Sequence, residues 1–399
     1  MASETGVTSP GPPVTVREIR TRSGFEALRA EWDRLGEMGG ASSPFLSHDW
    51  FRCCLDRQEN PELLILALVR EGEIQGIAPL WSQPERMRGG LKLRCLGFIS
   101  SPDTPETDLL VREEERLETI RALLRHIYGL AREGYDFASL GQWPSESPNC
   151  IAVRGLLAEE RRPSFVGVTS IAPHVPISGD WEAFWRSLSP MFRKSRRGIL
   201  NRMARAGAVE VECIREDPEG ARLADLLSVA ERGWKQSEGV SMAARAETRR
   251  FFESLTQAAS RNGWLFAWLL RLNGTPIAME YDLAYRGRVY ALRADYDESH
   301  RQLSPGAYLE YQIVRRLFEE GYQEYNSGPG LDSYKLRWTD RSRENISVNL
   351  CLPTWKGTAA WLLEGRLLPL LRRIRAAGKP GTDAARARAE VGPAPTGPA

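Results

Sequence analysis

The fold is decided by residues 288–338, which read RVYALRADYDESHRQLSPGAYLEYQIVRRLFEEGYQEYNSGPGLDSYKLRW. The apolar run 289–292 predicts a short strand. The Ser-Pro-Gly turn at 304–306 precedes an amphipathic helix that we expect to begin at Tyr308 and to end at a glycine. A second strand and a Gly-rich loop carrying Tyr-Lys follow. The stretch therefore predicts a strand, turn, helix and strand in succession, which is typical of an α/β protein.

The Ser-Pro-Gly turn places a helix N-terminus directly after a strand. The first N–H groups of a helix have no partner within it, and the helix dipole adds positive potential, so this end suits a phosphate. The backbone of five residues would line such an anion site: Gln302, Leu303, Ser304, Gly306 and Ala307. A purely structural turn fits the same residues. Pro305 also removes one N–H donor from the set.

The order of these motifs resembles that of a known family. It is similar to the second half of the cellulose-biosynthesis-type (CelD/BcsL-like) acetyltransferases, within the GNAT superfamily of CoA-dependent acyltransferases. The matching residues are Ser304, Pro305, Gly306, Leu309, Gly321, Gly328, Gly330, Tyr334, Lys335 and Trp338. Glu31-Trp32 and the run 43–50 are similar to the family's opening, so the resemblance spans residues 14–355. Fem-type peptidyltransferases are similar at a greater distance.

Composition restricts the class of protein. The chain has 399 residues, 42% of them hydrophobic, with 54 basic and 52 acidic residues. These values suit one large or two smaller globular domains and argue against a dedicated nucleic-acid binder. The six cysteines form no CxxC pair and the four histidines no cluster, so we expect no metal site and a reducing compartment. Without a leader-like opening or an apolar run near the ~20 residues of a membrane span, we expect a cytoplasmic location.

Two segments about two hundred residues apart repeat one plan. Residues 64–80 and 264–280 each predict a β-hairpin, with turns at Glu71-Gly72 and Asn273-Gly274. Helical sequence precedes each hairpin, and a strand, a helix and a closing strand follow the first at 93–98, 115–131 and 135–140. Two hairpins can resemble each other by chance, but the matching order of their neighbours favours an internal repeat.

Two copies of one unit predict an α/β fold with two mixed sheets flanked by helices. The family resemblance implies the same arrangement, a tandem GNAT fold. The predicted divisions are a disordered start at 1–13, a first GNAT-like domain at 14–175, a second at 176–355, an amphipathic helix at 356–376 and a disordered tail at 377–399. The loop 99–108 is acidic and lacks glycine, so it would repel phosphates. We therefore expect the second half to bind CoA and the first to shape the acceptor site.

Three residues near the Gly-rich loop are candidates for catalysis. Lys335 could stabilise a phosphate or a developing oxyanion, with Tyr334 beside it as a proton donor. Asp295 ends the central strand, where ligands bind in open α/β sheets, and is a candidate base or acceptor anchor. Asp297 and Glu280 are alternatives to it. Tyr281 and Tyr296 could be proton donors or packing residues. The same residues also fit purely structural roles. Lys335 could be an exposed lysine in a surface loop, and the carboxylates could be turn residues or partners of Arg293.

Two helical segments allow two interpretations each. Residues 192–205 carry six basic side chains, which could bind acidic groups of CoA or of the acceptor, or form a solvated face above Ile199, Leu200 and Met203. Residues 355–375 are amphipathic. They could lie on an anionic membrane surface, although we favour a helix docked on the second sheet.

The resemblance implies an N-acyltransferase. It would move an acyl group, acetyl in the first place, from acetyl-CoA or another acyl-CoA to a small-molecule primary amine, such as an amino sugar or an envelope or exopolysaccharide precursor. Attack would be direct, because no Cys or Ser-His pairing indicates an acyl-enzyme. We expect no nucleic-acid partner, and a peripheral contact with a membrane or with envelope-biosynthesis proteins is compatible with the sequence. The alternatives are a Fem-like aminoacyl-tRNA-dependent transferase and a non-catalytic GNAT scaffold in a polysaccharide-synthesis complex.

Overall fold

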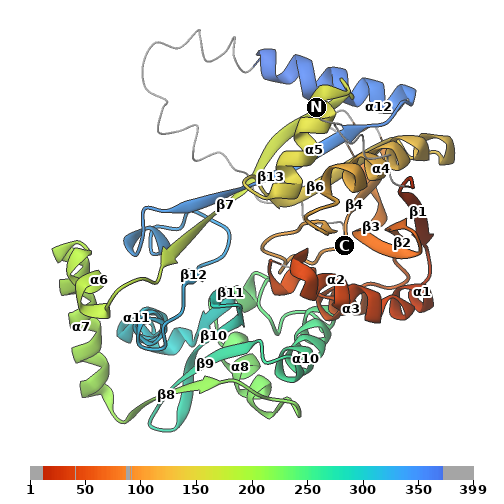
Figure 1. Ribbon diagram of the computed structural model, residues 1–399. Coiled ribbons are helices and arrows are strands. Elements are labelled where there is room, and N and C mark those ends of the chain that lie inside the picture. Colours follow the sequence, from red (N-terminus) through yellow and green to blue (C-terminus); the bar gives the residue numbers. More distant parts are fainter. Residues whose placement is uncertain (1–11, 41, 87–89, 91, 372–399) are drawn as a thin grey trace, which may run out of the picture.

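The computed structural model describes residues 12–371 except 41, 87–89 and 91 (Figure 1). The predicted disordered ends therefore lie outside the described residues, apart from 12 and 13. The first half contains β1 (Thr15–Ile19), α1 (Arg22–Ala27), α2 (Arg29–Leu35), η1 (Gly36–Gly40), η2 (Pro44–Leu46), α3 (His48–Asp56), β2 (Glu62–Arg70), β3 (Glu73–Arg86), β4 (Lys92–Phe98), β5 (Leu110–Val111), α4 (Arg116–Gly129), η3 (Leu130–Glu133), β6 (Phe137–Pro144), α5 (Pro148–Glu159) and β7 (Ser164–Pro176).

The second half begins with α6 and repeats much of this order. It contains α6 (Trp181–Ser187), α7 (Pro190–Ala206), β8 (Val209–Ile214), α8 (Ala221–Glu231), α9 (Trp234–Ser237), α10 (Ala246–Arg261), β9 (Leu265–Leu272), β10 (Thr275–Tyr285), β11 (Arg288–Tyr296), η4 (Glu298–Leu303), α11 (Pro305–Glu319), β12 (Glu324–Asn326), η5 (Lys335–Arg337), β13 (Ser342–Cys351), α12 (Trp355–Ala360) and η6 (Trp361–Leu367). The predicted mixed α/β class with helices flanking the strands is confirmed.

The internal repeat is visible in the two hairpins. β2–β3 and β9–β10 each turn through two residues of positive φ, at Glu71-Gly72 and Asn273-Gly274, which is the geometry that matches strand twist in a tight hairpin. Each hairpin then has one unpaired residue in its second strand, Gln75 in β3 and Ile277 in β10, three positions after the turn glycine. The same turn and the same bulge at the same spacing support a duplicated unit.

The two halves share one continuous sheet path. Its order is β1-β2-β3-β4-β6-β13-β7-β12-β11-β10-β9-β8, with β5 beside β3. β7 links the halves, because its residues 164–173 pair with β13 and residues 174–176 pair with β12 (Figure 1). β13 comes late in the chain yet lies between β6 and β7 of the first half. The predicted boundary at 175/176 therefore falls inside a connecting strand, and the predicted second domain contains a strand of the first sheet.

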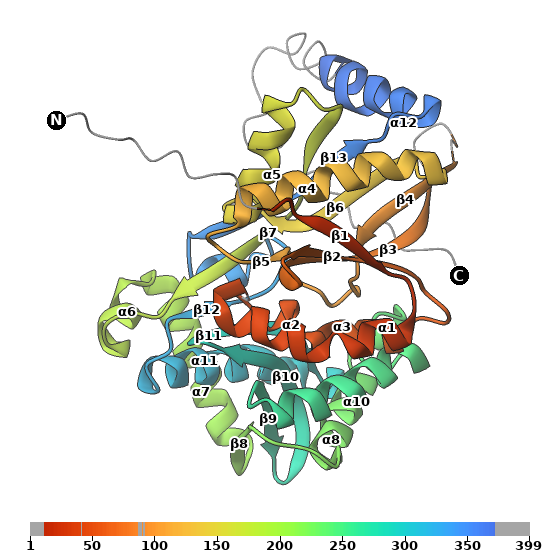
Figure 2. The same cartoon turned by 45° about the vertical axis from the view of Figure 1, so that its right-hand side comes forward.

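A shared apolar core joins the halves. The helices α1–α3 lie between the first set of strands and the second, as Figure 2 shows, and one cluster of buried residues combines their side chains with those of α8, α10, β9 and β10. Trp50 of α3 meets Phe251 of α10 edge-on at 5.6 Å between ring centroids, and Phe45 meets Tyr290 of β11 at 5.0 Å. Aromatic pairs of this kind add packing energy beyond the area that they bury.

The C-terminal helical segment, α12 with η6, lies on the first sheet, contrary to our expectation that it docks on the second. Trp361 and Ala360 pack with Phe137, Phe165 and Cys351 of β6, β7 and β13. The cause is the return of β13 to the first half, which places the following helix there. In the part of the chain that the structure describes, no helix is long and apolar enough to span a bilayer.

Candidate active site

The second half contains an opening between two parallel strands. β11 pairs with β12 only at residues 288–290, whereas it stays paired with β10 as far as Tyr296. After residue 290 the two strands therefore part, and one edge of β11 faces the gap. The register also shifts here, because Tyr281 is opposite Arg293 and Asp282 opposite Ala291. Leu292 is thus a bulge with no register partner in either neighbouring strand, and bulges of this kind often adjoin active sites.

Two lysine ammonium groups lie at the two edges of this opening. Lys235 of α9 donates to the Ala294 carbonyl of β11 at 2.5 Å and lies 3.6 Å from an Asp295 oxygen. Lys335 lies on the other side, where its Nζ donates to the carbonyls of Pro329 at 2.7 Å and Gly328 at 3.3 Å. No sequence pattern distinguishes Lys235, since a lysine in a short helix is ordinary.

Lys335 is buried, and its surroundings constrain its chemistry. Its Nζ is also 3.3 Å from Asp332 Oδ2, so the three N–H donors of the ammonium all face acceptors. Burial lowers the pKa of Lys335, and the charge of Asp332 opposes that change. The predicted lysine therefore holds the Gly-rich loop against the opening, while Tyr334 beside it is 49% exposed.

The predicted anion site lies at the start of α11, three residues earlier than expected. The helix begins at Pro305, where the ring costs no intrahelical hydrogen bond. Ser304 precedes it in the left-handed region, with φ 56°. The first-turn N–H groups of Gly306 and Ala307 have no partner among the described residues, as expected for a helix start. Gln302 and Leu303 end the short helix η4, which leads into this turn.

A buried ion pair supports the same helix start. Arg196 of α7 donates to the Ala307 carbonyl at 2.5 Å and to Glu310 Oε2 at 2.6 Å, and its guanidinium stacks on the rings of Phe192 and Trp338. The basic helix predicted at 192–205 thus turns one arginine inward. Four other basic residues of α7, one lysine and three arginines, are exposed: Lys194, Arg197, Arg202 and Arg205.

Carboxyl groups form the floor of the site on the α11 side of the sheet. Glu280 and Asp282 of β10 are buried, and Glu280 accepts a hydrogen bond from the Tyr325 hydroxyl of β12. Burial raises the pKa of Glu280 to about 7 and that of Asp282 well above its ordinary value. The charge of Glu280 raises the pKa of Asp282 further, whereas the hydrogen bonds of Glu280 with Tyr325 and Asp282 oppose the rise in its own pKa. Glu280 is opposite Ala294, next to the part of β11 that faces the gap. Such a carboxyl can exchange a proton near neutral pH.

The predicted catalytic residues do not form a single constellation. Asp295 is opposite Met279 and therefore points to the other face of the sheet from Glu280. It shares no hydrogen bond or ion pair with Lys335 in the described chain, although Lys235 contacts it. Burial raises the pKa of Asp295, and its Oδ2 has no partner there. Lys335 and Glu280 instead lie close enough for their charges to interact.

Three of the alternatives have structural contacts. Asp297 caps η4 by accepting from the Ser299 N–H at 3.0 Å and accepts from Arg232 Nε at 2.7 Å. Tyr281 is fully buried in the shared core and its hydroxyl meets Thr256 at 3.1 Å. Tyr296 is half-buried, and its ring lies 3.6 Å from the position of a Cβ added at Gly306.

The acidic loop of the first half has structural partners. Asp103 pairs with Arg57 at 3.0 Å and with Arg293 of β11, which joins the two halves. Asp108 accepts hydrogen bonds from Ser147, Asn149 and Trp143. In the described residues no group of three or more His, Cys, Asp or Glu side chains is arranged to hold a metal ion.

Comparison with known proteins agrees with the geometry of the second half. Residues 191–336 match the family model "Acetyltransferase (GNAT) domain", a range that includes the opening, α7, α11 and Lys335. A search of curated protein sequences finds no match.

Solved structures share the fold at low identity. FemX superposes with a TM-score of 0.54 at 12% identity, covering 83% of this chain and 96% of FemX. The C-terminal DUF2156 domain of a putative lysylphosphatidylglycerol synthetase from Agrobacterium fabrum gives 0.51 at 13%, covering 80% and 91%. A conserved protein of unknown function from Bacteroides thetaiotaomicron gives 0.50 at 12%, covering 85% and 99%. The matched residues 191–336 thus form a GNAT acetyltransferase-type domain, and this domain lies in a chain whose two α/β units share one continuous sheet path.

Proposed function

We propose that this protein transfers an acyl group, acetyl in the first place, from CoA to a primary amine, and that the thioester enters the opening between β11 and β12. The observation that carries the proposal is the bulge at Leu292 of β11. It lies just beyond residue 290, where the pairing of β11 with β12 ends. A backbone N–H presented there could polarise the thioester carbonyl as its oxygen becomes negative, which is a large contribution to acyl transfer.

The start of α11 is the proposed pyrophosphate site. The free N–H groups of Gly306 and Ala307 and the helix dipole favour an anion. The exposed basic residues of α7 add positive potential, because Arg196 ties that helix to the first turn of α11. Gln302, Leu303 and Ser304 complete the loop. Acyl-CoA is thus a co-substrate, and no metal takes part in the proposed step.

Glu280 is the proposed general base. An amine that arrives protonated must lose a proton before it attacks, and a carboxyl with a pKa of about 7 suits that task. Lys335 would hold the Gly-rich loop at the edge of the opening, and Tyr334 would protonate the leaving thiolate. Asp295 and Lys235, on the other face of the sheet, would anchor the acceptor amine between the two halves.

The acceptor and the finer family are also proposals. The sequence resemblance to CelD/BcsL-like acetyltransferases supports an amino sugar or an exopolysaccharide or envelope precursor, acted on in the cytoplasm. The fold likeness to FemX, together with four exposed basic residues on α7, keeps a Fem-like aminoacyl-tRNA-dependent transfer as the second candidate. A non-catalytic scaffold role would be compatible with the proline in the anion loop.

Calorimetric titration with acetyl-CoA tests the proposal. We expect binding to the intact protein and its loss in Gly306→Trp, since the indole would fill the space over the first turn of α11. Gly129→Trp is the matched control, because Gly129 is an exposed helical residue of α4 with open space around it. Absence of binding to the intact protein would overturn the acetyl-CoA proposal. Longer acyl-CoA thioesters and aminoacyl-tRNA would be titrated next.

A further inference from the structure

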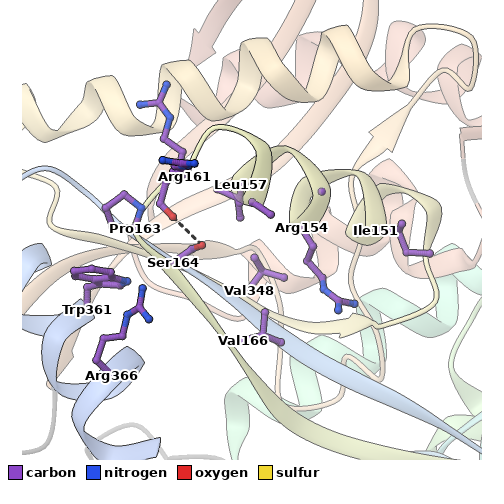
Figure 3. Close-up of a pocket in the computed structure, with 13 residues that line it drawn as sticks. Ile151, Arg154, Leu157, Arg161, Pro163, Ser164, Val166, Val348, Trp361 and Arg366 are labelled. Carbon is purple, nitrogen blue, oxygen red and sulfur yellow. Dashed lines mark hydrogen bonds between the residues drawn. The ribbon is translucent and has the colours of Figure 1, made fainter. Parts of the chain in front are cut away.

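A cavity lies in the first half, away from the proposed acyl-transfer site. It has a volume of about 870 Å³ and lies between α5, the strands β7 and β13, and the C-terminal segment η6 (Figure 3). The cavity adjoins the start of β7, whereas β12 pairs with the end of that strand. Ten residues of extended strand separate the two places by about 30 Å.

The rim of the cavity is strongly basic. Four arginines line it, Arg154, Arg161, Arg162 and Arg366, and none of its lining residues is acidic. Arg154, Arg161 and Arg366 take part in no ion pair within the described chain. Of the neighbouring carboxylates, Glu159 pairs with Arg121, and Glu160 pairs with Arg121 and with Arg162 of the rim. The unpaired guanidinium groups fit a phosphate or carboxylate.

The wall of the cavity is apolar. Figure 3 shows Val166 of β7 and Val348 of β13 on the floor, with Leu157 and Ile151 of α5 above them and Trp361 at the side. Val166 is 49% exposed and Ile151 55%. An apolar wall with a few polar groups at its border suits a ligand that has both an apolar and a charged part.

The apolar surface continues onto the adjoining helical segment. Leu362, Leu367, Leu370 and Leu371 are all about half-exposed, and Arg366 lies among them with its guanidinium 4.9 Å from the Trp361 ring centroid. A helix that exposes leucines beside arginines suits the interface of an anionic bilayer. The segment that follows, residues 372–399, has six basic and two acidic residues, so its charge has the same sign as the rim.

We propose that this cavity binds an anionic membrane lipid, with the head group at Arg154, Arg161 and Arg366 and the acyl chains along Val166, Val348 and the exposed leucines. Charge complementarity selects the occupant, since a basic rim above an apolar wall matches an anionic head above aliphatic chains. The first half would thereby dock the protein on a lipid surface independently of acyl transfer.

Vesicle flotation tests this inference on the full chain. We expect binding to vesicles of phosphatidylcholine mixed with phosphatidylglycerol and none to phosphatidylcholine alone. Arg154→Glu/Arg366→Glu should weaken binding at least about tenfold, and Val166→Ser should weaken it less. The control is Arg250→Glu/Arg261→Glu on α10, which makes the same change in net charge at two exposed residues without ion pairs in the described chain.

Two outcomes would overturn the inference. These are no binding to anionic vesicles, and equal losses in the cavity variant and the α10 control. Circular dichroism would verify that each variant is folded. Acetyl-CoA titration of the same variants separates this result from the proposed function, because the two sites lie on different halves.

Discussion

Arg196 shows how much one inward-facing side chain can determine. It is buried with Glu310 and is bonded to the first turn of α11. Arg196→Ala would leave the Glu310 carboxylate buried without its partner, so we expect a loss of about 3–5 kcal/mol in the free energy of unfolding. Urea denaturation measures it. The double change Arg196→Met/Glu310→Leu should recover most of the loss, and equal stability of the single and double variants would contradict this account.

Glu280 links stability to pH with a definite sign. Its pKa is about 7 in the folded protein against an ordinary value of 4.5, so the folded state binds the extra proton between these values and stability falls as pH rises through them. Glu280→Gln has no such titration. We expect the variant to match wild type near pH 4 and to be more stable at pH 8 by up to about 3 kcal/mol.

The same substitution distinguishes a catalytic from a structural carboxyl. A general base at this position predicts that Glu280→Gln slows acetyl transfer by about 10²–10⁴-fold while it stabilises the protein, because functional sites often retain unfavourable groups. Steady-state rates across pH would show loss of the limb near pH 7. Unchanged rates with higher stability would remove Glu280 from the mechanism.

At the scale of elements, β13 is the strand on which the first sheet most depends. It pairs with β6 on one side and with β7 on the other, far from its neighbours in sequence. A fragment that ends at residue 176 would expose the facing edges of β6 and β7, so we expect it to remain unfolded or to aggregate. Residues 12–173 joined by Asn-Gly to 342–371 should regain the sheet order of the first half, because Pro173 and Ser342 are already opposite each other. We expect this fragment to be less stable than the whole chain, because α1–α3 lose their partners in α8 and α10.

Far-UV circular dichroism and urea unfolding of the two fragments would test the role of β13. Cooperative unfolding of the shorter fragment would show that the first half is complete without β13 and would favour the boundary predicted from sequence. The C-terminal segment depends on the same strand, because it follows β13 and packs beside it.

At the scale of the whole molecule, the halves should unfold together. A single cluster of buried residues spans both halves, and Asp103 is bonded to Arg57 of the first half and Arg293 of the second. We expect coincident transitions for probes in each half, and a loss of about 3 kcal/mol for Asp103→Asn, which leaves two arginines without their shared carboxylate. Two separate transitions in a denaturant titration would contradict a shared core.

Local signals in the sequence were sufficient to predict most of the helices and strands. The turns at Glu71-Gly72 and Asn273-Gly274 specify tight hairpins because of the positive φ that they require, and these hairpins revealed the repeat. The Ser-Pro-Gly turn located the start of α11 to within three residues. Proline is favoured at the first helical position, which is why α11 begins at Pro305 and not at Tyr308.

The sequence by itself determined the α/β class, the duplicated unit and the turn that precedes α11, since turns, periodicity and motif order act over short stretches of chain. Only the tertiary structure decided that β13 lies in the first sheet, that Arg196 and Glu280 are buried, that Asp295 and Lys335 lie apart, and that Lys235 borders the opening. The physical reason is that strand pairing, burial and the resulting pKa shifts depend on residues distant in sequence, and no local pattern encodes which of them will meet.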